Sequence, residues 1–296
     1  MSFLEPTISQ MDNHFIMQNV YKPIRSKYVN IDSTFSDEYN TSSLAKFSIT
    51  FPQILQDVKQ IQVEHMEIPI QYYNFSSNRK NTTMNITDMQ SGSVYTLTTT
   101  DNQYDTSQTL LSEINTQWNK INTDLSFGFI NNRVQIKNMS TTKIYKISFA
   151  VDENGQFDKI RFKSKLGWAL GFRKIEYTFS PGQVTTAEGT LQLNTFRYFY
   201  LVLDEHSANF TNSFQVPIAS SGFLSKNVIA RISLGNTTYG KVTTFSRMYG
   251  NFYSDLRSYN GKTDLQKLKI ELIDEWGNNI HLNLSDFSFC LRVDYE

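Results

Sequence analysis

The sequence predicts an all-β protein, an antiparallel β-sandwich, and three observations lead to this fold class. Phe and Tyr, with 22 and 16 residues, far outnumber Trp with 3. Many short segments alternate apolar and polar residues and are separated by turn sequences, and a single segment has helical periodicity. Aromatic and β-branched residues suit the pleated surface of a strand, and many short strands with turns between them favour a sandwich.

The N-terminal interval, residues 1–42, is polar and has no sustained period. It contains a basic cluster, Lys22, Arg25 and Lys27, around Pro23, which disfavours a helix there. Ordering such a segment costs about 1–2 kcal/mol of backbone entropy per residue, so we expect it to become ordered mainly against a partner. The interval is therefore predicted to be an extended arm, with Lys22, Arg25 and Lys27 as candidate partner-binding residues.

The sandwich itself is predicted for residues 43–296, and its first strand is clear. Alternation runs from Ala45 to Phe51 and is expected to end at Pro52. It continues at Ile61 and Val63, then resumes out of phase over Met66–Ile70. Such a one-residue phase slip, around Glu64 and His65, is typical of a β-bulge.

One helix is predicted, within an insertion in the sandwich at about residues 93–175. Asp105 and Gln108 have the spacing of a capping box. Apolar residues then recur at helical spacing at Leu110, Leu111, Ile114, Trp118 and Ile121.

The second half is dense in predicted strands. Phe196–Leu203 is almost continuously apolar, which indicates a strand buried on both faces. Near the C-terminus, Leu268–Leu272 and Ile280–Leu284 flank a turn at Asp274–Asn278, which predicts a hairpin. A last strand is expected to present one apolar face, made of Phe287, Phe289, Leu291, Val293 and Tyr295.

Charge and composition exclude some classes of function. Lys and Arg together number 28, as do Asp and Glu, so the formal net charge is zero. A protein that coats nucleic acid needs a basic excess, so no specific nucleic-acid partner is expected. No apolar run is long enough to span a bilayer. The one cysteine, Cys290, cannot form an intrachain disulfide and is expected to be a buried or half-buried structural side chain.

Residues that could carry catalysis are sparse. The four histidines are scattered without metal-ligand spacing, so no metal or cofactor is predicted. Asp204, Glu205, Asp274 and Glu275 could in principle form a pair of glycosidase carboxylates if the fold brought them together. Acids between strands are usually solvated turn residues, so we expect no catalytic residue and no enzyme.

Several stretches occur in an order that resembles one protein family. They comprise Tyr28–Phe35, Phe47–Phe51, Val63–Pro69, Tyr72–Phe75, the helix at Thr109–Trp118, Leu166–Arg173, and the C-terminal hairpin and strand at Leu268–Tyr295. Together they resemble minor capsid and penton-type proteins of nucleocytoplasmic large DNA viruses and of virophages. The stretch Leu166–Arg173 also predicts a tight turn that places Trp168, Leu170 and Phe172 in the core, with two glycines for close backbone approach or positive φ.

The resemblance implies a fold and a role. The fold is a jelly-roll sandwich with one helix-bearing insertion and an N-terminal arm. The role is that of a structural subunit of the virion, assembled in the host cytoplasm. Its partners would be copies of itself, as a cyclic oligomer such as a pentamer, together with the major capsid protein and other minor capsid proteins. The resemblance leaves vertex and cementing positions open. The alternatives are a receptor- or glycan-binding β module on the particle surface and, third, a carbohydrate-active enzyme.

Overall fold

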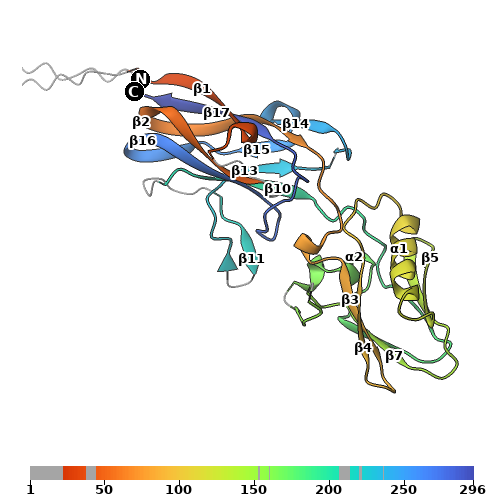
Figure 1. Ribbon diagram of the computed structural model, residues 1–296. Coiled ribbons are helices and arrows are strands. Elements are labelled where there is room, and N and C mark those ends of the chain that lie inside the picture. Colours follow the sequence, from red (N-terminus) through yellow and green to blue (C-terminus); the bar gives the residue numbers. More distant parts are fainter. Residues whose placement is uncertain are drawn as a thin grey trace, which may run out of the picture.

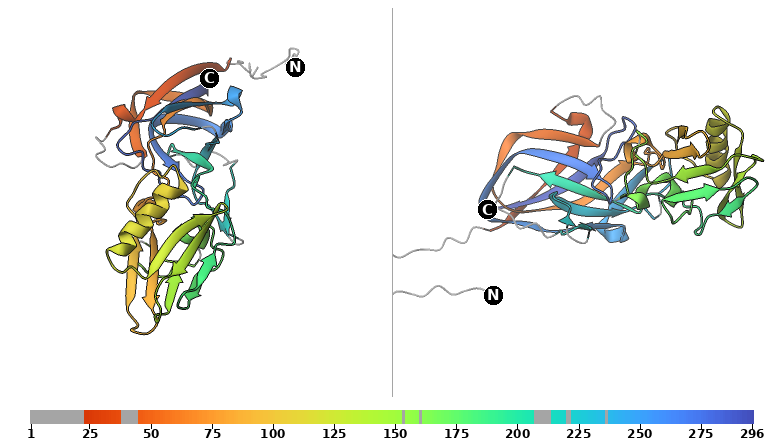
Figure 2. Two further views of the ribbon diagram at one scale, coloured as in Figure 1. Left: turned by 90° about the vertical axis from the view of Figure 1, so that its right-hand side faces the viewer. Right: turned by 90° about the horizontal axis from the view of Figure 1, so that it is seen from below.

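The structure is a computed structural model, and it describes residues 23–37, 45–152, 154–159, 161–206, 214–219, 222–235 and 237–296. The chain forms two lobes placed end to end (Figures 1 and 2), each with its own hydrophobic cluster. We call residues 23–74 and 194–296 the sandwich lobe and residues 75–193 the insert lobe. The predicted insertion interval, about residues 93–175, falls inside the insert lobe.

The sandwich lobe is built on one antiparallel sheet in the order β1-β17-β2-β16-β10-β13-β15, with β14 also paired to β2. Val63 of β2 donates its backbone N–H to the hydroxyl of Ser254 in β15, at 3.0 Å. The last strand in the order therefore returns to the middle of the sheet, and the sheet curls around a single core. The strands are β1 (Arg25–Asp32), β2 (Lys46–Pro69), β10 (Tyr198–Asp204), β13 (Val228–Ser233), β14 (Val242–Ser246), β15 (Phe252–Ser254), β16 (Arg257–Ile273) and β17 (Ser288–Tyr295), with short 3-10 turns η1 (Ser33–Phe35) and η4 (Arg247–Tyr249).

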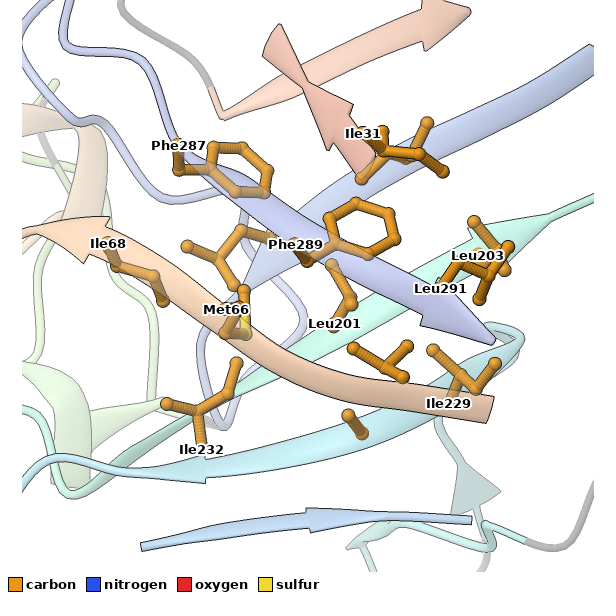
Figure 3. Packing of buried hydrophobic residues seen from close by; sticks show 14 of the residues in the cluster. Ile31, Met66, Ile68, Leu201, Leu203, Ile229, Ile232, Phe287, Phe289 and Leu291 are labelled. Atoms are coloured by element: carbon orange, nitrogen blue, oxygen red, sulfur yellow. The ribbon is translucent and has the colours of Figure 1, made fainter. Parts of the chain in front are cut away.

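The core inside this sheet joins strands that are far apart in the sequence. Phe289 of β17, Met66 of β2 and Leu201 of β10 point toward one another (Figure 3), and all three are fully buried. The all-β, antiparallel sandwich predicted from the sequence is thus confirmed. It takes the form of one strongly curled sheet.

The predicted bulge in β2 is confirmed. Cys290 of β17 is opposite His65, and Leu291 is opposite Val63, so Glu64 is the extra residue. The strand does not end at Pro52, however, and this expectation is wrong. The β2–β16 ladder shifts register between the pairs Thr50–Lys267 and Leu55–Leu265, so Pro52, which has no N–H, lies in an irregular stretch of a continuous strand.

Strand β10 is buried on both faces, as predicted. Leu201 and Leu203 face the main core, whereas Tyr200 and Val202 belong to a second cluster on the outer face. Val216 and Leu224 pack on this outer cluster, next to the small hairpin of β11 (Pro217–Ala219) and β12 (Gly222–Phe223).

The C-terminal segment follows the prediction in part. The turn at Asp274–Asn278 is present, and Phe287, Phe289, Leu291 and Val293 are buried, with Tyr295 half-buried. The expected strand Ile280–Leu284 is absent. Ile280 and Leu282 are buried as loop residues, and Leu284 is 67% exposed with a φ of +65°. The alternating apolar residues Ile280 and Leu282 are therefore buried in a loop that forms no strand.

Part of the interval predicted to be an arm is a strand. β1 runs from Arg25 to Asp32 and pairs with β17 along its whole length. Its inward positions carry only two apolar residues, Val29 and Ile31, and Ile31 is fully buried. Two apolar residues among exposed polar ones are too few to reveal a strand by alternation.

The insert lobe packs two small sheets and a helix around its own core. The sheets have the orders β4-β3-β7-β8 and β5-β6-β9. The elements are η2 (Ser77–Arg79), β3 (Thr83–Asp88), β4 (Val94–Thr98), α1 (Ser107–Asn119), β5 (Leu125–Ile130), β6 (Arg133–Asn138), β7 (Tyr145–Ser148), η3 (Phe162–Ser164), α2 (Leu166–Ala169), β8 (Glu176–Phe179) and β9 (Val184–Thr186).

The predicted helix is α1, and its four apolar residues Leu110, Leu111, Ile114 and Trp118 are buried as expected. Its N-cap differs from the prediction. The hydroxyl of Thr106 accepts the N–H of Thr109 at 3.2 Å, so Asp105 and Gln108 form no capping box. Ile121 lies beyond the end of the helix and is 42% exposed.

The glycines of Leu166–Arg173 are both required by close packing. A Cβ at Gly167 would lie 2.2 Å from Cγ of the buried Phe149 ring. Gly171 has a φ of +97°, and a Cβ there would lie 2.4 Å from the carbonyl oxygen of Gly189. Leu170 and Phe172 are fully buried as predicted, whereas Trp168 is half-buried under the guanidinium of Arg173, 4.1 Å from its ring centroid.

Candidate assembly edge

Strand β1 is an open edge of the main sheet. It pairs with β17 on one side, and in the described part of the chain no strand pairs with its other side. An open edge presents unpaired N–H and C=O groups that can accept a strand from another molecule. The edge lies at the end of the sandwich lobe remote from the insert lobe, beside the C-terminus (Figure 1). It carries exposed side chains at Ile24 and Tyr28, 56% and 63% exposed.

Two of the three candidate partner-binding residues lie on this edge strand. Arg25 and Lys27 are exposed and share one face of β1, because side chains two residues apart in a strand point the same way. The Nζ of Lys27 lies 5.8 Å from the ring centroid of Tyr295. Lys22 lies outside the described residues. The structure thus brings Arg25 and Lys27 together at the edge, where their charges are available to a neighbour.

A buried carboxylate ties β1 to the sheet. Asp294 of β17 is 1% exposed, and it accepts hydrogen bonds from the hydroxyl of Ser26 (2.6 Å), the side-chain amide of Gln60 (2.6 Å) and Nε of Arg292 (2.9 Å). Burial alone would raise the pKa of the Asp294 carboxyl, but the hydrogen bonds from Gln60, Ser26 and Arg292 outweigh burial and lower that pKa. No local sequence pattern marks this residue, because its partners come from three different strands.

Acid should weaken this network. Since the pKa of Asp294 is lower in the folded protein, its contribution to stability is full above the ordinary Asp pKa of about 4 and is lost as the pH falls toward the lowered value. We expect Asp294→Asn to destabilise the protein at pH 7 and to have a much smaller effect near pH 3. Urea unfolding of both proteins at several pH values measures the difference. A difference that does not change with pH would contradict this assignment.

Two of the acids considered as possible catalysts, Glu205 and Asp274, have structural partners instead. Glu205 is buried with Arg257, at 2.8 Å between Oε2 and Nη1, and the hydroxyl of Tyr259 donates to its Oε1 at 2.8 Å. Burial and the charge of Glu205 raise the pKa of Tyr259. The carboxylate of Asp274 accepts the backbone N–H groups of Trp276 and Asn278 and closes the turn. Glu205 and Asp274 are thus buried rather than solvated, which corrects the expectation.

The fold also keeps the two acidic pairs apart. Asp204 is opposite Lys269 in the β10–β16 ladder, whereas Asp274 follows Ile273, which is opposite Tyr200. These two positions are four residues apart along the paired strands, a distance of roughly 13 Å at the usual rise of a strand. The carboxylates of a glycosidase lie roughly 5–9.5 Å apart. The structure therefore does not assemble Asp204, Glu205, Asp274 and Glu275 into that kind of site.

Cys290 is half-buried in β17, as predicted. Burial raises the pKa of its thiol, and the carboxylates of Glu64 and Glu67 raise it further. A reactive thiol needs the opposite shift. Among the described residues, no three His, Cys, Asp or Glu side chains lie close enough together to hold a metal ion. The helices in the described part of the chain are too short or too polar to cross a membrane.

Comparisons with known proteins give matches among solved structures alone. No protein-family model matches the chain, and no curated protein sequence is similar to it. The chain is similar to the mavirus penton protein, with 11% identity and a TM-score of 0.42 over 92% of this chain and 100% of that one. It is also similar to a chain in the cryo-EM structure of the Sputnik virophage, with 14% identity and a TM-score of 0.43 over 93% of this chain and 98% of that one. The penton-type resemblance expected from the sequence is thus also found among solved structures.

Proposed function

We propose that the chain is a non-enzymatic structural protein of a virus particle, a minor capsid or penton-type subunit that assembles with the major capsid protein. The open edge of β1 carries this proposal, because an unprotected sheet edge is a ready site for a neighbouring subunit. The first and last stretches of the sequence resemblance support it. Tyr28–Phe35 contains most of β1, and Leu268–Tyr295 contains β17, and the two strands pair to form this edge.

The proposed mode of assembly is strand addition to β1. A neighbouring chain adds a strand through main-chain hydrogen bonds, and Lys22, Arg25 and Lys27 contact acidic groups of that neighbour. Two β1 edges joined to each other would give a closed pair with two-fold symmetry. A cyclic oligomer of more than two copies, such as a pentamer, needs β1 to meet a different surface of the next copy. The proposed location is the virion, with assembly in the host cytoplasm.

Charge reversal at the edge tests this proposal. We expect Arg25→Glu with Lys27→Glu to leave the melting temperature unchanged, because both side chains are exposed, and to abolish incorporation into particles when the protein is coexpressed with the major capsid protein. Arg133→Glu with Lys137→Glu is the matched control, since both residues are exposed on one face of β6 in the insert lobe. Incorporation of the β1 variant at the level of the control would remove the basic pair from the assembly mechanism.

A further inference from the structure

A cleft of about 340 Å³ opens where the two lobes meet. Two connections cross between the lobes at this point, residues 70–74 and 193–197 (Figure 1). The walls are completed by Gln103 of the insert lobe and by five residues of the sandwich lobe, Ser233, Leu234, Gly235, Thr237 and Tyr239. Ligand sites commonly form between structural units and have volumes of about 300–1,000 Å³, so this cleft lies at the lower end of that range.

The floor of the cleft is held in place before any ligand arrives. The ring of Phe196 packs edge-on against Tyr72, with centroids 4.7 Å apart. The guanidinium of Arg79 lies 3.4 Å from the centroid of Phe196 and donates hydrogen bonds to the backbone carbonyls of Asn74 (3.2 Å) and Thr195 (3.1 Å). Arg79 therefore fastens the two connections to each other, and a ligand would not have to order them.

Three polar side chains that line the cleft form no side-chain hydrogen bond with the described residues and can bind a ligand. They are Asn194 and Arg197, which are exposed, and Ser233, which is half-buried. Other polar groups of the same cleft are already used, as with Asn74, whose amide donates to the carbonyls of Tyr104 and Leu193. Arg197 is the one charged residue that lines the cleft.

An aromatic ring stands beside these three side chains. Tyr239 lines the cleft and is 38% exposed. Tyr73 stacks against it with ring centroids 6.5 Å apart and an interplanar angle of 26°. A ring supported on one side offers a firm apolar platform to a ligand.

We propose that this cleft binds a terminal glycan residue that carries a carboxylate. The planar guanidinium of Arg197 fits a carboxylate through two parallel hydrogen bonds. The amide of Asn194 and the hydroxyl of Ser233 both donate and accept, which matches neighbouring sugar hydroxyls. The C–H face of the sugar ring packs on an aromatic platform, which Tyr239 supplies. This site is separate from the assembly edge of β1, so loss of either activity leaves the other intact.

The test uses 3′-sialyllactose and lactose, which differ by the acidic sugar, with the full-length protein and calorimetric titration. We expect the wild type to bind 3′-sialyllactose about tenfold or more tightly than lactose, because hydrogen bonds between charged groups are the stronger ones. Arg197→Gln should remove this preference, and Tyr239→Ala should weaken both sugars. Arg231→Gln is the matched control. Arg231 is exposed and, like Arg197, lies over the ring of Tyr198, but it does not line the cleft.

Three results would overturn the proposal: no binding of either sugar to the wild type at millimolar concentration, an unchanged preference in Arg197→Gln, or equally tight binding of a short peptide through its C-terminal carboxylate. Asn194→Ala gives a second variant at an exposed position, with an expected loss of affinity for both sugars. Arg197→Gln should enter particles as the wild type does, which separates failure of this site from failure of the assembly proposal.

Discussion

Removing residues 286–296 should leave a chain that does not fold. Strand β17 lies between β1 and β2 and pairs with both. The deletion also removes four buried side chains, Phe287, Phe289, Leu291 and Val293. At about 1.5–3 kcal/mol each, they contribute roughly 6–12 kcal/mol as an upper bound. A typical domain has a total stability of about 5–15 kcal/mol. Circular dichroism of the truncated protein tests this, and a cooperative thermal transition would show that the sheet survives without β17.

A single substitution gives a graded form of the same test. Phe289→Ala should lower the free energy of unfolding by about 3–5 kcal/mol, because it leaves a cavity under a fully buried ring. Phe35→Ala is the matched control, since Phe35 is 73% exposed and its loss should cost less than about 0.5 kcal/mol. Urea denaturation measures both values.

Arg257→Ala should destabilise the sandwich lobe by about 3–5 kcal/mol, because it leaves the carboxylate of Glu205 buried without its cation. The side chains of Arg257 and Glu205 are 3% and 0% exposed. Arg257 also donates to the backbone carbonyls of Leu203 (2.8 Å) and Asn227 (3.1 Å), so its removal leaves further acceptors unpaired. Urea denaturation measures the loss, and the exposed Arg231→Ala is the matched control.

Replacing the whole network should restore much of this stability. In the triple variant Glu205→Leu, Arg257→Met and Tyr259→Phe, no buried charge is left unpaired, and apolar side chains of similar volume fill the space. If the triple variant were as unstable as Arg257→Ala, the loss would come from packing or from the unpaired backbone carbonyls of Leu203 and Asn227, and not from the unpaired carboxylate.

The sequence was sufficient to predict the parts of the fold with strong local patterns. Alternation located β2 and its bulge at Glu64, and a continuous apolar run located β10. Strand β1 was missed because Val29 and Ile31 are its only inward apolar residues and its partner β17 lies at the other end of the chain. Ile280–Leu284 was wrongly predicted to be a strand because a buried loop can have the same apolar spacing.

The candidate sites were harder to predict for a related reason. The sequence marked Arg25 and Lys27 through their clustering, but it could not show that they share one face of an edge strand. Glu205 and Arg257 are 52 residues apart, and charged residues near the ends of strands are ordinarily solvated, so their pairing has no local signal. The cleft between the lobes is built from separate segments that only the tertiary fold brings together.

The two connections between the lobes allow the insert lobe to be exchanged as a unit without changing the sandwich lobe. The chain enters and leaves this lobe at one place, because the side-chain amide of Asn74 donates to the carbonyl of Leu193 at 3.1 Å and the hydroxyl of Thr195 donates to the carbonyl of Asn74 at 2.7 Å. A module whose ends coincide can be lengthened, shortened or replaced without changing the strand register of its host, since the host chain enters and leaves at one point. Evolution can therefore diversify this lobe while the curled sheet and its open edge stay the same.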